Sequence, residues 1–412
     1  MRRPSIISLV VCTLGLILLG LHYYIAKRLV LDPDVPEPWR AGLLLALGFA
    51  AASLFLVPIS SRKLPRSWSR LIVWPSSVWM GIAFWLVSLL GLTDLLLGLA
   101  RFVRVASLTP EEETSVSAIR ATMVASSVAI AGVVALRSGM RPPRHQKVEI
   151  ELERWPRALD RFRIVQITDI HIGKILGRRF AEHVVGRVND LAPDLIAVTG
   201  DLADGEVRDL ADEVAPFGRL RAKCGVFFVT GNHDHYSGVV AWVAKAGELG
   251  MRTLRNERVE IREGEAIFDL VGVDDHRGSM IAEGGREDLP KALTGRDVRR
   301  PAILLAHDPS TFRQASLLGI DLQISGHTHG GQIWPFGYIV RLAIPFVAGR
   351  YCRNGSQLYV SRGTGFWGPP MRLFAPAEIT ELVIRSASVK GRAFGAGGDE
   401  IEQPNQGSLI RL

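Results

Sequence analysis

The sequence predicts an α-helical membrane region followed by a globular α/β domain. Two observations lead to this division: long apolar runs are confined to residues 1–145, and short apolar runs alternate with amphipathic stretches from residue 148 onward. A hydrophobic content of 48% and a mean hydropathy of +0.19 are high for a soluble chain of 412 residues. We therefore expect part of the chain to lie in a lipid bilayer.

The apolar runs predict about four spans within a transmembrane region of residues 1–145. A signal peptide is the alternative for the first run, but no small-residue cleavage site follows it, so a retained helix is the better interpretation. The third run is longer than the ~20 residues that one crossing needs. Asp94 interrupts this run, so its second half is expected to be tilted, interfacial or re-entrant. The spans are expected at about 6–25, 41–60, 72–95 and 116–136.

The distribution of Lys and Arg predicts that both ends of the membrane region face the cytoplasm. Basic residues are dense at the N-terminus, in the 61–70 loop and after the fourth span: Arg2, Arg3, Arg62, Lys63, Arg66, Arg70, Arg137, Arg141, Arg144 and Lys147. The opposite loops carry fewer: Lys27, Arg28, Arg40, Arg101 and Arg104. We expect a multi-pass protein of the cell (inner) membrane with the following domain in the cytoplasm. One span more or less would reverse that side.

The net charge of +8 belongs to the hydrophobic part of the chain. Residues 1–150 hold 16 Lys/Arg and 8 Asp/Glu, and the remainder holds 33 of each. Binding to nucleic acid is therefore not indicated. The three cysteines, Cys12, Cys224 and Cys352, are far apart and lack CxxC spacing, so neither a disulfide framework nor a thiolate zinc site is indicated.

Residues 148–385 alternate between strand and helix patterns, which indicates an α/β domain with helices covering sheets. Strands are predicted at 161–171, 194–201, 225–234, 266–273, 302–308 and 321–327, and helices at 178–191 and about 237–249. The last segment, 386–412, is rich in Gly, Ser and charge and is expected to be disordered.

Polar residues of the metal-ligand type follow five of these strands. Because sites in open α/β sheets form at the carboxyl ends of strands, we expect these residues to converge. The candidates are Asp169, His171, Asp201, Asn232, His233, Asp234, His307, His327 and His329. Residues two apart in an extended segment face the same side, so the histidines of "GHTH" can face one centre. The rival interpretation, a chance collection of turn-forming residues, is disfavoured by the order of the motifs.

Three glycines precede these positions, at Gly200, Gly231 and Gly326. A bulky side chain there would block the close approach of the backbone to an ion.

Nitrogen and oxygen ligands without a thiolate suit Mn, Fe, Zn or Ni better than Ca or a structural zinc.

The ordered motifs "D-x-H … G-D … G-N-H-D … H … G-H-x-H" resemble the calcineurin-like metallophosphoesterase superfamily. The resemblance covers about residues 160–385, and five motifs in the right order are far more specific than any one of them. The segments "GHTHGGQIWPFG" and "YVSRGTGFWGPPMRLFAPAEI" are similar to the bacterial membrane-associated branch. The front end resembles transmembrane proteins with a metallophosphoesterase domain. The resemblance implies a four-layer αββα sandwich.

The resemblance also implies two divalent or trivalent metal ions, with Mn, Fe or Zn expected. The first would be held by Asp169, His171, Asp201 and His329, and the second by Asp201, Asn232, His307 and His327. Two ions bridged by Asp201 at ~3.5–4 Å clamp a phosphoryl group and a hydroxide that attacks phosphorus in line. His233 is expected to protonate or stabilise the leaving oxygen, with Asp234 holding it oriented.

These features predict a membrane-anchored, dinuclear metal-dependent phosphoesterase that hydrolyses a phosphodiester or pyrophosphate, with a lipid or lipid precursor as an attractive substrate. The alternatives are a phosphodiesterase or pyrophosphatase acting on soluble nucleotides, and a non-catalytic metal-binding membrane scaffold. The complete ligand set and His233 favour catalysis. Trp334 and Phe336 in "QIWPFG" belong either to ordinary packing or to an apolar lip that admits a lipid or an aromatic substrate.

Overall fold

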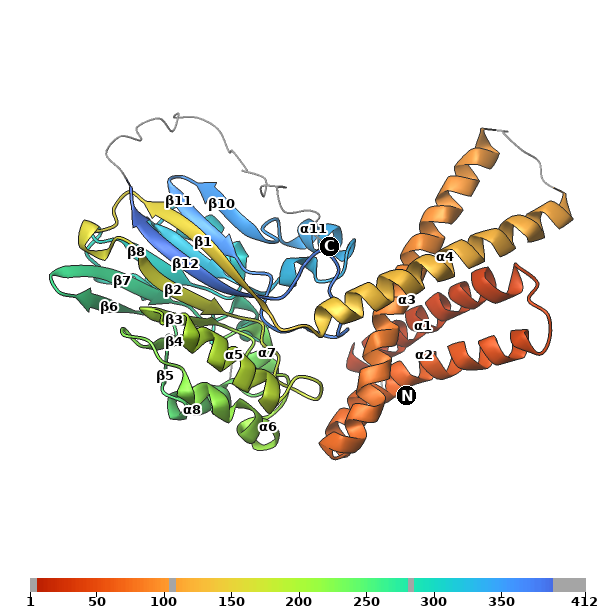
Figure 1. Ribbon diagram of the computed structural model, residues 1–412, viewed down its shortest axis with the longest axis horizontal. Helices are drawn as coiled ribbons and strands as arrows, with labels where there is room; N and C mark the ends of the chain where they lie inside the picture. The colour runs from red at the N-terminus through yellow and green to blue at the C-terminus, as the bar shows by residue number, and fades with distance from the viewer. Residues whose placement is uncertain (1–5, 104–108, 281–284, 388–412) are drawn as a thin grey trace. The chain divides into compact units, whose positions relative to one another are not determined.

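The computed structural model describes residues 6–103, 109–280 and 285–387, which fall into two compact units. One unit comprises the chain up to Met140 together with Gly368–Met371, and the other comprises Arg141–Trp367 and the chain from Arg372 onward. The first is built of long helices and the second of stacked sheets and shorter helices (Figure 1). Apart from its first two residues, the tail expected at 386–412 lies outside the described residues, as do Arg2, Arg3 and Arg104.

Within residues 6–103 and 109–140, four long helices form the first unit. They are α1 Ile6–Ala26, extended by a π-helical turn at Lys27–Leu31, α2 Trp39–Lys63, α3 Arg66–Phe102 and α4 Pro110–Gly139. All four are long and apolar enough to cross a membrane, by length and composition. The predicted helical region of about four spans is confirmed in this sense, and each expected span lies inside one helix.

The third helix, α3, continues without a break past Asp94, so its second half is not re-entrant, whereas a tilted or interfacial second half stays compatible with the structure. The Asp94 carboxylate accepts hydrogen bonds from Tyr24 Oη at 2.7 Å, Arg28 Nε at 3.0 Å and Arg120 Nη1 at 2.6 Å. Two guanidinium groups from neighbouring helices thus neutralise the charge, so the helix need not end or bend away to expose it. The contact ties α1, α3 and α4 together.

Replacing Asp94 by Asn should destabilise the helical unit. The amide keeps the shape but leaves Arg28 and Arg120 with less counter-charge, and we expect a loss of about 1–3 kcal/mol because Asp94 is only partly buried. We expect a lower midpoint in thermal unfolding followed by far-UV circular dichroism in detergent. The control is Asp34→Asn, since Asp34 is exposed and lies 4.0 Å from Arg40. Equal midpoints for Asp94→Asn and the unmodified protein would contradict the assignment.

The second unit contains two six-stranded sheets. The first has the order β1-β12-β2-β3-β4-β5, with β1 Arg144–Leu152, β12 Glu378–Ser386, β2 Phe162–Ile167, β3 Leu195–Thr199, β4 Val226–Val229 and β5 Met251–Thr253. The second has the order β10-β11-β9-β8-β7-β6, with β10 Gly349–Arg353, β11 Ser356–Val360, β9 Leu322–Ser325, β8 Ala302–Leu305, β7 Ala266–Gly272 and β6 Glu257–Glu263. In the first sheet β2, β3, β4 and β5 pair in parallel, and β12 is antiparallel to β2.

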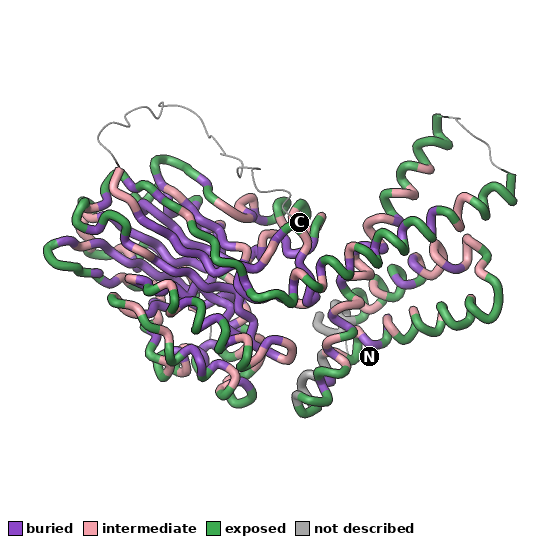
Figure 2. The backbone as a smooth tube through the Cα atoms, in the orientation of Figure 1, coloured by how far each residue is buried: buried purple, intermediate pink, exposed green. Residues whose placement is uncertain are grey.

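The strands bury both faces, and this produces four layers. Within β2, Ile164 belongs to the core between the two sheets, and Val165 belongs to the core under the helices. The helices on the first sheet are α5 Arg178–Asp190, α6 Val207–Val214 and α8 Val239–Glu248, and those on the second are α9 Leu289–Ala292 and α10 Phe312–Ala315. Figure 2 shows the buried residues concentrated in the strands. The predicted αββα sandwich is confirmed, and two-sided burial explains why central strands read as continuous apolar runs.

Candidate metal centre

The loops that leave β2, β3, β4, β8 and β9 bring the predicted ligand residues together. They are Asp169 and His171 after β2, Asp201 after β3, Asn232 at the start of α7 Asn232–Tyr236 after β4, His307 after β8, and His327 and His329 after β9. All are buried except His327, which is half-buried. Convergence at the carboxyl ends of strands is the arrangement that the sequence predicted.

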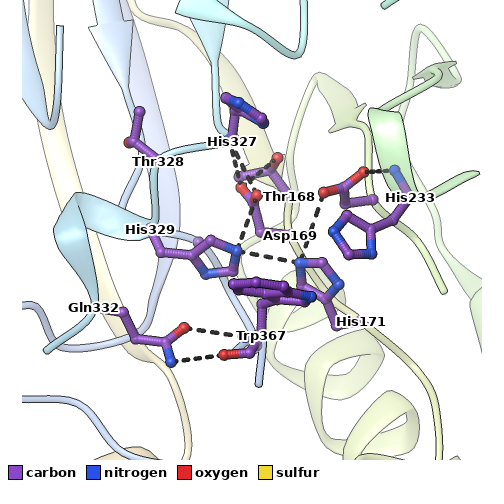
Figure 3. Close-up of polar contacts among 12 residues, drawn as sticks. Thr168, Asp169, His171, His233, His327, Thr328, His329, Gln332 and Trp367 are labelled. Carbon is purple, nitrogen blue, oxygen red and sulfur yellow. Dashed lines mark hydrogen bonds and ion pairs between the residues drawn. The ribbon is translucent and has the colours of Figure 1, made fainter. Parts of the chain in front are cut away.

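Three groups of three side chains lie close enough together to hold a metal ion, and two of these groups consist of predicted ligands alone. Asp169, His171 and His329 form one group, and Asp201, His307 and His327 form the other, with the ligand atoms of each group within 4.8 Å of one another. Figure 3 shows the side chains of the first group pointing toward one another, with His171 Nε2 3.1 Å from His329 Nε2.

Asp201 belongs to the second group and also faces the first. Its Oδ2 is 3.2 Å from His307 Nε2 and 3.7 Å from His171 Nε2. Burial raises the pKa of this carboxyl, but the charge of His307 and its hydrogen bond outweigh burial and hold the pKa well below its usual range. A buried, charged carboxylate that faces both groups is suited to bridging two cations.

The backbone at the ligand positions is strained. Asp169, His171, Asp201, His327 and His329 all have positive φ, between 50° and 73°. This left-handed region costs roughly 1–2 kcal/mol for a residue with a side chain. Strain of this kind is retained where the surrounding structure needs the resulting side-chain direction.

The glycines that precede the ligands lie directly against neighbouring ligand side chains. A Cβ atom on Gly231 would overlap with Asp201 Oδ1, one on Gly326 with Asp169 Oδ2, and one on Gly200 with His307 Nδ1. Only glycine therefore allows these three loops to approach so closely.

The remaining donor atoms also fit metal ions. The Oδ1 atom of Asn232 is buried and has no hydrogen-bond partner among the described residues, which is costly unless a cation binds it. His307 Nδ1 lies 2.8 Å from the carbonyl oxygen of Thr199, so its Nε2 is directed toward Asp201. Burial, with the neighbouring His307, lowers the pKa of His327 to about 3. Its imidazole is therefore neutral near pH 7, as a ligand must be.

Asp204 was not among the predicted site residues, yet it contacts two of them. Its Oδ1 lies 2.8 Å from His233 Nδ1 and 2.9 Å from His171 Nδ1. Burial raises the pKa of Asp204, but the charge of His171 outweighs burial and holds the pKa well below its usual range. The only sequence signal was a second carboxylate three residues after Asp201 in "GDLAD".

The structure gives Asp234 a different contact from the one expected. Its carboxylate accepts hydrogen bonds from the backbone N–H groups of Gly231 at 2.8 Å, Asp201 at 2.9 Å and Leu202 at 3.0 Å. Adjacent residues in a helical turn point in directions about 100° apart, so Asp234 and His233 face different neighbours. Asp234 therefore joins the loops after β3 and β4, and Asp204 is the carboxylate that contacts the His233 ring.

Aromatic side chains surround His233. Its ring centroid lies 5.8 Å from that of Trp367 and 5.5 Å from that of Tyr236. Gln332 holds the backbone of Trp367 through two hydrogen bonds, of 2.8 Å to its carbonyl oxygen and 3.0 Å from its N–H (Figure 3). Trp334 is half exposed, with its ring 6.3 Å from that of Phe374, so it is not a core residue. Phe336 is of intermediate exposure.

Asp204→Asn should weaken both of its histidine contacts. An amide accepts a weaker hydrogen bond than a carboxylate from either ring, so we expect turnover on an aryl phosphodiester to fall by about two orders of magnitude. Manganese affinity should fall by roughly tenfold, because His171 loses the partner that orients it. Asp209→Asn, on the exposed face of α6, is the matched control. Unchanged turnover and affinity in Asp204→Asn would show that the pairing is not used.

Known proteins share both parts of this chain. Residues 162–331 match the sequence profile described as calcineurin-like phosphoesterase. A transmembrane protein with metallophosphoesterase domain from Danio rerio is 34% identical over 390 residues, which cover 90% of this chain and 88% of the relative. Its namesake from Bos taurus is 38% identical over 287 residues, covering 67% of this chain and 65% of the relative, slightly under two thirds of its length. An uncharacterised metallophosphoesterase from Helicobacter pylori is 36% identical over 246 residues, covering 59% and 64%.

Proposed function

The chain belongs to the calcineurin-like metallophosphoesterases, and from this premise we propose that it is a membrane-anchored hydrolase that cleaves a phosphodiester or pyrophosphate with two bound metal ions. Metal-dependent hydrolysis of phosphoesters is the activity of this family. The observation that carries the proposal is the pair of ligand groups, one of which contains Asp201 while the other faces it, together with the His233–Asp204 pair.

The proposed ligand sets share Asp201. Asp169, His171, Asp201 and His329 hold the first ion, and Asp201, Asn232, His307 and His327 hold the second. When bound, the two ions supply the charge that activates a water molecule and neutralises the phosphoryl oxygens. Manganese, iron and zinc suit this set of nitrogen and oxygen donors.

His233 is the proposed proton donor to the leaving oxygen. Its ring nitrogen lies within 4.8 Å of the ligand atoms of His171 and Asp201, and its Nδ1 is held by Asp204. A histidine fixed by a carboxylate at one nitrogen presents the other in a defined direction, as proton transfer requires. Asp234 contributes as a positioning residue, because it fixes the backbone of the loops that carry Asp201 and His233.

Two substitutions separate metal binding from proton transfer. Asp201→Asn and His233→Ala should each lower turnover by about 10²-fold or more, and only Asp201→Asn should also lose bound metal, measured by plasma mass spectrometry. His183→Ala, at an exposed position of α5, should change neither quantity. Folded, metal-loaded protein that hydrolyses no aryl phosphomonoester or phosphodiester would contradict the proposed activity.

We propose a lipid or lipid precursor as the carrier of the phosphoester. The membrane-capable helices support this choice, since anchoring confines the metal centre to the surface where such substrates lie. The alternative is a soluble nucleotide substrate. In that case the helices would only fix the protein to the membrane and would have no part in presenting the substrate. A panel of phospholipids, lipid-linked nucleotides, cyclic nucleotides and monoesters, assayed with Mn, Fe and Zn, distinguishes the two. Binding of metal without turnover on any member would favour a non-catalytic scaffold.

We place the protein in the cell (inner) membrane with its catalytic domain in the cytoplasm. The basic loop between α2 and α3 and the basic residues after α4 support this orientation, because an even number of spans puts both on one side. A protease added to intact cells should leave the domain whole, and the same protease should digest it after permeabilisation. Digestion in intact cells would reverse the proposed side.

A further inference from the structure

Helix α11, Phe336–Ala343, carries large apolar side chains that are exposed. Tyr338 is 65% exposed and Leu342 is 89% exposed, and no residue of the helix is buried. Tyr338, Ile339 and Leu342 lie on one face, because residues three or four apart on a helix are neighbours. A helix on a water-facing surface normally places polar residues there, so an apolar face of this kind indicates contact with something apolar.

Two aromatic residues next to α11 enlarge this face. Trp334 is half exposed and Phe374 is 68% exposed, and their rings lie 6.3 Å apart. Backbone bridges from Ile333 to Leu373 and Phe374 hold the two segments together. We call the combined area of Trp334, Tyr338, Ile339, Leu342 and Phe374 the apolar rim.

The chain segment that carries the apolar rim has charges of one sign. No acidic residue occurs between Asp321 and Glu378 in the sequence, whereas five arginines do. Three of these are exposed, Arg341, Arg350 and Arg353, and Arg341 lies on α11 itself. Apolar and aromatic side chains accompanied by arginine are typical of surfaces that enter the headgroup region of a bilayer with anionic lipids.

The apolar rim is connected to the metal centre by short segments. Trp334 follows His329 by five residues in the sequence. Gln332, between them, holds Trp367, whose ring is next to that of His233. A surface that touches lipid headgroups at the rim would therefore lie beside the catalytic groups.

We propose that the apolar rim is a membrane-docking surface, which inserts its side chains among lipid headgroups and holds the metal centre at the level of lipid phosphates. The bilayer that the apolar rim would contact is the one that the helices of the same chain would cross. The link between helices and sheets is short, since only residues 140–143 lie between the end of α4 and the start of β1. The purpose of the docking, which is to present a lipid-borne phosphoester to the metal centre, rests on the proposed function. The contact with the membrane does not.

Fluorescence quenching tests the docking without reference to activity. The full chain, with Cys12, Cys224 and Cys352 replaced by Ser, is reconstituted in phosphatidylcholine–phosphatidylglycerol vesicles and labelled at Tyr338→Cys or Leu342→Cys with an environment-sensitive dye. Nitroxide-bearing lipids should quench both labels strongly. They should quench a label at Leu317→Cys much less, since Leu317 is 72% exposed in the same domain but outside the rim. Equal quenching at all three positions would overturn the proposal.

A competing occupant, a second copy of this chain, has a distinct readout. Self-quenching between labelled chains at 338 or 342, without quenching by nitroxide lipids, would assign the apolar rim to a dimer and overturn membrane docking.

Activity provides a second test. Tyr338→Glu combined with Leu342→Glu should lower turnover of a phosphoester embedded in vesicles by about tenfold or more, since two apolar side chains no longer enter the lipid. Turnover of a small water-soluble aryl phosphodiester should not change, and Leu317→Glu should affect neither substrate. Equal loss on both substrates would overturn the docking role. If the unmodified protein hydrolyses neither substrate, the proposed function fails, and the quenching result alone decides the docking.

Discussion

The catalytic domain depends on keeping the carboxylate of Asp201 charged although it is buried. An isolated buried carboxylate costs several kcal/mol and becomes protonated instead. Here His307 lies 3.2 Å from its Oδ2, and the backbone N–H of His233 donates to its Oδ1 at 2.8 Å. The loops after β3, β4 and β8 must therefore approach one another closely, and this accounts for the positive φ of Asp201, for Gly200 and Gly231, and for the hydrogen bonds that Asp234 accepts from the backbone.

The six strands that the sequence predicted, β2, β3, β4, β7, β8 and β9, are buried on both faces, and apolar residues dominate each of them. In contrast, β6, Glu257–Glu263, carries charged residues on its exposed face, and β5, Met251–Thr253, is too short to show a period. The metal-ligand types were recognisable from their motifs. Asp204 was missed because its contact with His233 depends on the paths of two loops, 29 positions apart in the numbering.

In the membrane region, too, the sequence could not reveal contacts between residues that are far apart along the chain. Hydropathy predicted the number and approximate position of the long helices, since each is one apolar run. It could not show that α3 continues past Asp94, because the residues that neutralise this carboxylate, Arg28 and Arg120, belong to other helices. A charge in an apolar run indicates a break only when no partner lies within reach, and the distance to a partner is a property of the packed helices.

The carboxylate of Asp204 connects metal binding with proton transfer. It faces His171, a proposed metal ligand, and His233, the proposed proton donor. A metal ion bound at the Nε2 of His171 would make its Nδ1–H a stronger donor to Asp204. Metal loading would therefore change how Asp204 divides its contacts between the two imidazoles. An ion in the first site and the position of the His233 ring would then be coupled through Asp204, even though they share no ligand.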